Sequence, residues 1–311
     1  MSVVKIIQKR GRPSGSTYLG TGKPEEIGKI AAELKADAVI INGMLKGNQI
    51  FNLSQKIKCR ILDRVDVILS IFEQHAVTAE AKLQIKRARI EYDIAKLYRR
   101  EAATLFERER GGRGIVVRGA GESGIEAERR HIKEQIRRID EKITEMRNIR
   151  KNQRERRKRS GLFTAAIIGY TNAGKSALMH ALTGKNVLVA NKLFATLDTR
   201  MSGLWLPNLQ KKMLIADTIG FIQNLPPQLI TAFKSTLEEA IEADILIHVF
   251  DVSESIQDQR KKHKTVMSIL KELGCHQPIL QAGNKIDLLP EEKIQKLEEK
   301  KNIILISAEK K

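Results

Sequence analysis

The order of apolar and polar residues divides the chain into three parts. In residues 1–77 and again in residues 161–311, short apolar runs alternate with amphipathic stretches, as in strands that alternate with helices. Residues 78–160 instead hold two long stretches with the period of a helix. The sequence therefore predicts an α/β fold with a small N-terminal parallel α/β domain, a long antiparallel helical hairpin and a C-terminal doubly wound sheet.

The first part is expected to be a small parallel sheet with helices. Residues 16–20 are expected to be extended. Apolar runs predict strands at residues 3–7, 38–41 and 60–62. Amphipathic stretches predict helices at residues 24–34, 49–57 and 65–74. No group of residues in this part has the pattern of a catalytic site, and His75 is expected to be structural or on the surface.

The middle part is expected to form an arm about 45 Å long, at ~1.5 Å of rise per helical residue. Residues 78–108 lack Pro and Gly and have helical periodicity. A second helix is expected from near Glu122. Its apolar positions have the spacing of a coiled-coil seam: Ile132, Ile136, Ile139, Ile143 and Met146. Residues 110–121 are rich in Gly and Arg, and we expect this loop at the far tip of the arm.

The third part is expected to be a sheet with its ligand loops at the carboxyl ends of the strands. Apolar runs predict strands at residues 164–168, 203–206, 213–216, 244–250, 279–281 and 303–306. Helices are expected after Gly174, Pro227, Ser253 and Pro290.

The first of these strands leads into a sequence that fits G-x-x-x-x-G-K-[ST]. A strand, a glycine-rich loop and a helix give backbone N–H groups and a helix N-terminus that can bind phosphate. Lys175 can reach the β- and γ-phosphates, and the Ser176 hydroxyl can bind Mg²⁺. The predicted phosphate-binding residues are Gly169, Tyr170, Thr171, Asn172, Ala173, Gly174, Lys175, Ser176 and Ala177.

Two further segments are expected to contact the phosphates and the metal. Asp217 follows a predicted strand and can hold Mg²⁺, and the Gly220 N–H can approach a γ-phosphate. Thr196 is the predicted metal-binding threonine, with Thr199 as the second choice. We predict Ser176, Thr196 and Asp217 as metal ligands and Lys175, Thr196 and Gly220 as catalytic residues. The nucleotide contacts expected from these two segments are Phe194, Ala195, Thr196, Asp217, Thr218, Ile219 and Gly220.

The last two motifs indicate a guanine base. The Asp287 carboxylate can accept hydrogen bonds from guanine N1–H and the exocyclic amine, which adenine does not offer in that arrangement. Asn284 can bond the base edge, Lys285 can cover the purine face, and Ser307-Ala308 can present a backbone N–H to guanine O6. Five GTPase elements thus occur in order, and the sequence predicts hydrolysis of GTP to GDP.

Two residues bear on the rate of that reaction. Phe221 follows Gly220 and cannot orient a water molecule, whereas some GTPases have a glutamine there, so hydrolysis is expected to be slow without a partner. Asn172 stands where some GTPases use Asn to hold K⁺, and K⁺ dependence is a further hypothesis.

The excess of basic residues predicts a polyanionic partner such as RNA or DNA. Lys and Arg total 56 against 37 acidic residues, a net charge of +19, and the excess is clustered. The second long helix is expected to end in a basic run at residues 150–159, and a solvated helix end or linker and a localisation signal are the alternatives to RNA binding there. The predicted RNA contacts are Arg110, Arg113, Arg118, Arg154, Arg156, Arg157, Lys158 and Arg159.

Other aspects of composition indicate the compartment. The two cysteines have no metal-site spacing and favour a reducing cytosol. No apolar run is long enough for a signal peptide or a membrane span, so a cytoplasmic protein is expected.

These motifs together resemble the HflX-type GTPases over nearly the whole chain. The resemblance rests on residues 169–176, 193–198, 217–222 and 236–240, and upstream on residues 17–20, 118–122 and 126–130. It implies a cytoplasmic, ribosome-associated GTPase that binds the large ribosomal subunit, and some members split stalled or idle ribosomes. The arm's loop would reach towards the peptidyl-transferase region, and a monomer is expected.

The chain departs from the family pattern in a few places. Ala120 stands where the family usually has Pro, residues 123–125 where it has Thr-Gln-Leu, and Thr199 where Pro follows the aspartate. The sequence stops at Lys311, before the last helix that a GTPase domain normally adds, so that helix is expected to be missing.

Two other functions remain open from the sequence. The chain can be a GTPase that acts on another RNA, as in tRNA modification or ribosome assembly. It can also be a non-catalytic RNA-binding module with a truncated nucleotide domain.

Overall fold

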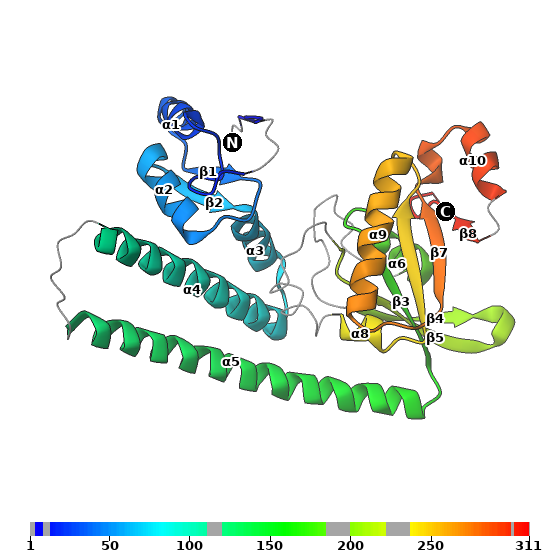
Figure 1. Cartoon of the computed structure of the whole chain (residues 1–311). Coiled ribbons are helices and arrows are strands. Elements are labelled where there is room, and N and C mark those ends of the chain that lie inside the picture. The colour runs from blue at the N-terminus through cyan, green and yellow to red at the C-terminus, as the bar shows by residue number, and fades with distance from the viewer. Residues whose placement is uncertain are drawn as a thin grey trace. The chain divides into compact units, whose positions relative to one another are not determined.

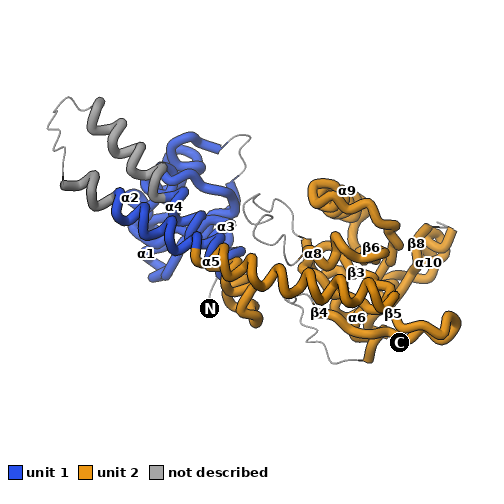
Figure 2. Tube along the Cα trace, turned by 90° about the horizontal axis from the view of Figure 1, so that it is seen from below, with its two compact units in different colours: residues 1–70, 87–137 blue, residues 71–86, 138–311 orange. Residues whose placement is uncertain are grey.

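The structure is a computed structural model of the 311-residue chain. It describes residues 4–8, 13–110, 120–184, 200–221, 237–299 and 302–310, without the side chains of residues 97–110 and 120–125. The chain divides into two compact units (Figure 2). Unit 1 consists of residues 1–70 and 87–137, and unit 2 of residues 71–86 and 138–311. None of the described helices is both long and apolar enough to cross a membrane.

Unit 1 contains a two-stranded parallel sheet, β1 (Ala38–Ile41) and β2 (Arg60–Asp63), with Ala38 opposite Arg60. Helices α1 (Lys23–Glu33) and α2 (Gly47–Ile57) pack with it around Leu53 and Ile57, as predicted. Pro24 in the first turn of α1 has a fixed φ suited to a helix start, and Glu25 and Glu26 favour that end of the helix dipole.

The start of α3 (Arg64–His75) is held by a polar cluster. Asp66 accepts hydrogen bonds from Arg89 and Lys96 of α4, and Asp63 accepts one from Tyr92 of the same helix. Burial acts to raise the pKa of Asp66, but the bonds from Lys96 and Asp63 outweigh it and lower that pKa. These contacts fasten the middle of α4 to the sheet of unit 1.

Two predictions near the N-terminus are wrong. Residues 4–8 do not form a strand, and the side chains of Val4 and Ile7 are exposed, so no element in the described part of the chain buries an apolar face there. Residues 16–20 are not extended. Ser14 and Tyr18 close a turn by exchanging two backbone hydrogen bonds, and Tyr18 has a φ of 64°.

Two long helices follow, α4 (Ala79–Arg110) and α5 (Ala120–Arg159), as predicted. In α5, Ile139 is buried, and the rest of the predicted seam is half-buried: Ile132, Ile136, Ile143 and Met146. Arg150 of α5 contacts Glu80 at the start of α4, which is the pairing that an antiparallel hairpin gives. Arg113 and Arg118 of the predicted tip lie outside the described residues, as does the side chain of Arg110.

Unit 2 is built on a six-stranded sheet with the order β4-β5-β3-β6-β7-β8 (Figure 1). The pairing of β4 with β5 is antiparallel and the other pairings are parallel. The strands are β3 (Phe163–Gly169), β4 (Arg200–Leu206), β5 (Lys211–Asp217), β6 (Ile245–Asp251), β7 (Ile279–Asn284) and β8 (Ile303–Leu305). The central strand β3 is apolar and buried from Ala165 onward, as is typical of a strand covered on both faces.

Helices cover both faces of this sheet. Met179 packs against Ile167 and Ile215 on one face, and His248 of β6 meets His263 on the other. The helices are α6 (Lys175–Thr183), α8 (Glu238–Ile241), α9 (Ile256–Glu272) and α10 (Glu291–Glu298), with 3₁₀ turns η1 (Pro207–Leu209) and η2 (Ile286–Leu288). The helix predicted after Pro227 and the predicted contacts Phe194, Ala195 and Thr196 lie outside the described residues.

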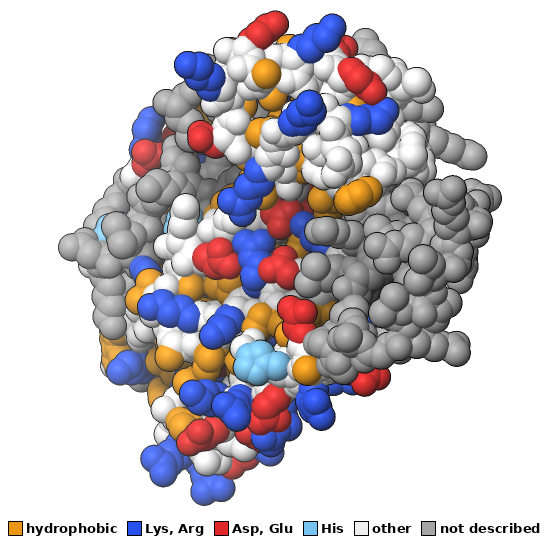
Figure 3. All heavy atoms as spheres, turned by 90° about the vertical axis from the view of Figure 1, so that its left-hand side faces the viewer, with side chains coloured by type: hydrophobic (Ala, Val, Ile, Leu, Met, Phe, Trp, Pro, Cys, Tyr) orange, Lys and Arg blue, Asp and Glu red, His pale blue; other side chains and the backbone are white. Residues whose placement is uncertain are grey.

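The surface is mixed in charge where it can be seen. On the face drawn in Figure 3, Lys and Arg side chains alternate with Asp and Glu side chains. The described residues of this face therefore do not form a purely basic area.

Candidate nucleotide site

The predicted phosphate-binding loop, or phosphate loop, spans residues 169–176. It leaves β3 at Gly169 and enters α6 after Gly174. Gly169 has a φ of 152°, and a Cβ there would lie 2.2 Å from the Val249 carbonyl oxygen. Gly174 has a φ of 94°, and a Cβ there would lie 2.1 Å from Asn284 Nδ2. Both positions therefore need glycine, because a side chain would push the loop away from its neighbours.

Lys175 is buried beneath this loop. Its Nζ donates to the Tyr170 carbonyl oxygen at 2.9 Å. Burial lowers the pKa of Lys175 to about 8, and the nearby Asp217 carboxylate partly offsets that effect. A Cβ on Gly220 would lie 2.7 Å from Lys175 Nζ. Gly220 thus lies directly against Lys175, the lysine predicted to bind phosphate.

The predicted metal ligands that the structure describes lie together. Ser176 Oγ donates to Asp217 Oδ2 at 2.7 Å, and Asp217 has no solvent exposure. A hydroxyl and a carboxylate are the oxygen donors that Mg²⁺ takes in nucleotide sites. Ser176 and Asp217 therefore fit Mg²⁺ by their chemistry and their separation.

The segment of residues 217–221 is also joined to the phosphate loop by backbone hydrogen bonds. Phe221 N–H donates to the Gly169 carbonyl at 3.0 Å, and Thr171 N–H donates to the Phe221 carbonyl at 2.8 Å. The Phe221 side chain is buried. Thr218 Oγ1 donates to the Ile167 carbonyl, so this hydroxyl points into the sheet and not towards a ligand. The Phe221 contact was missed because backbone pairing leaves no signal in residue type.

The predicted base-binding residues come from two loops joined by Asn284. Its Nδ2 donates to the Ala173 carbonyl of the phosphate loop, and its Oδ1 accepts from Ala308 N–H, both at 2.9 Å. Ser307 Oγ donates to Asp287 Oδ1 at 2.6 Å. One buried amide thus joins the phosphate loop to the Ser307-Ala308 turn, and a hydroxyl orients the Asp287 carboxylate.

Sequence reasoning missed Asp251, at the end of β6. Its Oδ2 lies 2.7 Å from Lys285 Nζ and fixes that side chain, whose backbone has a φ of 70°. Burial acts to raise the pKa of Asp251, but hydrogen bonds from Lys285 and Ser253 outweigh it and lower that pKa. A lone aspartate after an apolar run offers no motif, so only the strand order brings it to the lysine.

His248 is a second missed residue, in a small pocket that also touches Tyr170, Thr171 and Ala173 of the phosphate loop. Burial lowers the pKa of His248 to about 4, and the charges of His263 and Lys175 act in the same direction. The His248 ring is therefore neutral near pH 7 and adds no positive charge beside the phosphate loop.

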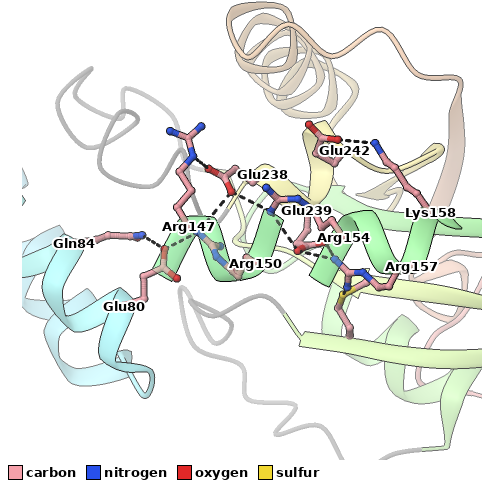
Figure 4. Close-up of polar contacts among 11 residues, drawn as sticks. Glu80, Gln84, Arg147, Arg150, Arg154, Arg157, Lys158, Glu238, Glu239 and Glu242 are labelled. Carbon is pink, nitrogen blue, oxygen red and sulfur yellow. Dashed lines mark hydrogen bonds and ion pairs between the residues drawn. The ribbon is translucent and has the colours of Figure 1, made fainter. Parts of the chain in front are cut away.

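Part of the predicted RNA-binding run faces the protein itself (Figure 4). Arg154 Nη1 lies 3.0 Å from Glu238 Oε2, and Arg157 Nη2 lies 3.0 Å from Glu239 Oε2. Lys158 Nζ lies 2.8 Å from Glu242 Oε2. Arg156 and Arg159 are exposed on the other side of α5. The run thus has two faces, and its RNA contacts stay a prediction.

Three family models match successive parts of the chain. They are the N-terminal region of GTP-binding GTPases at residues 1–73, their middle region at residues 75–157, and a 50S ribosome-binding GTPase at residues 164–285. GTPase HflX of Flavobacterium psychrophilum is 41% identical over 287 residues, 92% of this chain and 67% of that protein. The chain belongs to the HflX GTPase family.

Other comparisons agree with this membership. GTPase HflX of Caldanaerobacter subterraneus subsp. tengcongensis is 42% identical over 285 residues, 91% of this chain. The chain spans 65% of that relative's length. The crystal structure of SsGBP in complex with GDP is 28% identical with a TM-score of 0.52, covering 96% of this chain and 83% of that one. The HflX resemblance and the predicted fold class are thereby confirmed.

Proposed function

We propose that this chain binds GTP with Mg²⁺ and hydrolyses it to GDP and phosphate. One observation carries the proposal: Asn284 bonds the phosphate loop and the Ser307-Ala308 turn at once, beside an Asp287 carboxylate oriented by Ser307. This arrangement supports a carboxylate that reads guanine next to a loop that binds phosphate. The family membership supports the same activity.

The described residues of the candidate site have distinct proposed roles. Lys175 neutralises phosphate charge, and the Gly220 N–H can donate to a γ-phosphate oxygen without side-chain obstruction. Ser176 and Asp217 would hold Mg²⁺, which when bound stabilises negative charge on the phosphates. Asp287 selects guanine. Thr196 and the contacts at residues 194–195 stay predictions for the same site.

Hydrolysis by the chain alone is proposed to be slow. Phe221 is buried and has no group that could orient an attacking water. Asn172 is exposed in the phosphate loop, and K⁺ bound there is a further part of the hypothesis. Comparing turnover in KCl and NaCl at equal ionic strength checks it, and equal rates would remove K⁺ from the proposal.

The proposed partner is the large ribosomal subunit, in the cytoplasm, with ribosome splitting as the family-based outcome. The net charge of +19 and the match to the model of 50S ribosome-binding GTPases support it. The proposed domains are residues 1–77, 78–160 and 161–311, acting as a monomer.

Phosphate release with GTP, with and without purified large subunits, tests this function. We expect slow release alone, faster release with subunits, and none with Lys175→Ala. Co-sedimentation with a non-hydrolysable GTP analogue identifies the partner. Binding to other RNAs but not to subunits would favour a GTPase of tRNA modification or ribosome assembly. No release under any condition would favour a non-catalytic module.

A further inference from the structure

The candidate nucleotide site lies at the carboxyl ends of the parallel strands of unit 2. A hairpin projects from the opposite end of the sheet, where β3 begins. Phe163, the first residue of β3, lies opposite Met213 of β5, which lies opposite Leu204 of β4. The last rungs of the β4–β5 pair, Trp205 with Lys212 and Leu206 with Lys211, therefore lie beyond the start of β3. Figure 1 shows this hairpin extending past the sheet.

The end of the hairpin combines exposed apolar and basic side chains. Trp205 is 54% exposed, and it is the one tryptophan of the sequence. Leu209 in the η1 turn is 64% exposed. Lys212 is exposed and is the cross-strand partner of Trp205, so the two side chains lie on the same face of the hairpin. Lys211 is also exposed, but it pairs with Leu206 and its side chain lies on the other face. An exposed indole offers a base a surface for stacking, and a lysine on the same face offers a charge for the adjoining phosphate.

The end of α5 adds charge on the same side of the sheet. Arg157 donates to the Met201 sulfur of β4. Met201 and Trp205 lie on one face of β4, about 13 Å apart along the strand at ~3.3 Å per residue. Arg157 in the last turn of α5 therefore contacts the strand that carries Trp205.

The cations of α5 that point away from unit 2 remain available at this end. Arg154, Arg157 and Lys158 are neutralised by the glutamates of the loop and helix around α8 (Figure 4). Arg156 is exposed, and Arg159 reaches its nearest acid, Glu155, only at 4.0 Å.

We propose that Trp205, Lys212, Arg156 and Arg159 form a docking surface for RNA with unpaired bases. One base stacks on the Trp205 indole, and the three cations hold the flanking phosphates. Charge complementarity favours RNA, because all charged residues between Arg200 and Lys212 are cations and the chain carries a charge of +19. The inference rests on the RNA partner of the proposed function and names a contact for it.

The single tryptophan allows a direct test on the full chain. The fluorescence of Trp205, excited selectively over tyrosine, is measured during titration with one of three ligands. These are a single-stranded oligoribonucleotide, the matching duplex and a poly-glutamate peptide. We expect quenching by the single strand that weakens as salt rises, with a smaller effect of the duplex. No change with any RNA, or equal quenching by poly-glutamate, would overturn the proposal.

Variants measure the same contact with labelled RNA. Trp205→Ala should weaken single-strand binding about 5- to 100-fold, the range for loss of one stacking aromatic, and Trp205→Phe should recover much of it. The hairpin variant Lys212→Glu should weaken binding by at least about threefold. The matched control is Lys261→Glu, the same charge change at an exposed position of α9.

If the control and the hairpin variant lose the same affinity for RNA, the effect is one of net charge alone. That result would overturn the docking surface. Failure of this inference is separable from failure of the proposed function. Each variant is also tested for RNA-free GTP turnover and for co-sedimentation with large subunits. If subunits still bind and Trp205→Ala leaves RNA binding unchanged, the hairpin contact is wrong while the ribosomal role stands.

Discussion

Arg154 of α5 and Glu238 of α8 form a largely buried ion pair, with Arg154 Nη1 3.0 Å from Glu238 Oε2. The side chains are 12% and 6% exposed. Arg147 Nε also reaches Glu238, at 2.6 Å, and Arg150 Nη2 reaches it at 3.6 Å. A carboxylate in this environment is stable only because several cations surround it. Glu238 therefore fastens the end of α5 to α8, together with the Arg157–Glu239 and Lys158–Glu242 pairs.

Glu238→Gln should lower the free energy of unfolding by about 3 kcal/mol, because it leaves desolvated arginines without their counter-charge. Urea unfolding measures the change. Glu242→Gln is the matched control, since its pair with Lys158 is 43% and 61% exposed, and it should change that free energy by less than ~1 kcal/mol. Equal effects of the two variants would contradict the buried role of Glu238.

The affinity for GTP should fall as the pH rises through the pKa of Lys175, about 8 in the empty site. Phosphate binds the charged lysine, so above this pKa the protein must take up a proton when it binds. From pH 7 to 8.8 the affinity should fall roughly five- to tenfold, since ~1.4 kcal/mol corresponds to one pKa unit. This range stays below the pKa of guanine N1–H.

Calorimetry at pH 8.5 in two buffers of different ionisation enthalpy measures this proton uptake. The expected uptake lies between zero and one proton per nucleotide. A pH-independent affinity without proton uptake would show that Lys175 is already fully charged in the empty site.

Asp217→Asn should lower GTP hydrolysis at least about 100-fold, because one of the two described metal ligands loses its charge. The Mg²⁺ concentration for half-maximal turnover should rise. The neighbouring Thr218→Val removes a hydrogen bond to the Ile167 carbonyl, and should cost about 1 kcal/mol of stability with the Mg²⁺ requirement unchanged. A normal Mg²⁺ requirement in Asp217→Asn would exclude this aspartate from the metal site.

Asp287→Asn should exchange guanine for xanthine specificity. An amide can donate to the C2 carbonyl of xanthine, but it cannot accept both guanine donors as a carboxylate does. We expect weaker GTP binding by at least about tenfold and stronger XTP binding. Competition of both nucleotides with a fluorescent guanine nucleotide measures this, and an unchanged preference would argue against base contact by Asp287.

Much of the fold follows from local sequence. The apolar run at residues 164–168, the glycines at 169 and 174 and the helix after Lys175 have the predicted forms, because each depends on nearby residues. Residues 16–20 form a turn instead, since local hydrogen bonds between Ser14 and Tyr18 compete with extension.

Residue type alone does not tell where a basic side chain points. Arg154 and Arg156 are equivalent in the sequence, yet one meets Glu238 and the other meets solvent. The position of the helix on the sheet decides between them. Asp251 and Lys285 likewise meet because β6 and β7 are neighbours in the sheet. The predicted RNA contacts and the individual nucleotide contacts therefore stay predictions until binding is measured.

Calorimetric titration of the chain with GTP and with ATP, each with Mg²⁺, decides whether these loops bind a guanine nucleotide. We expect saturable heat with GTP, no saturable heat with ATP, and loss of the GTP signal in Lys175→Ala. Equal binding of the two nucleotides, or no heat with either, would contradict the guanine site and every function proposed from it.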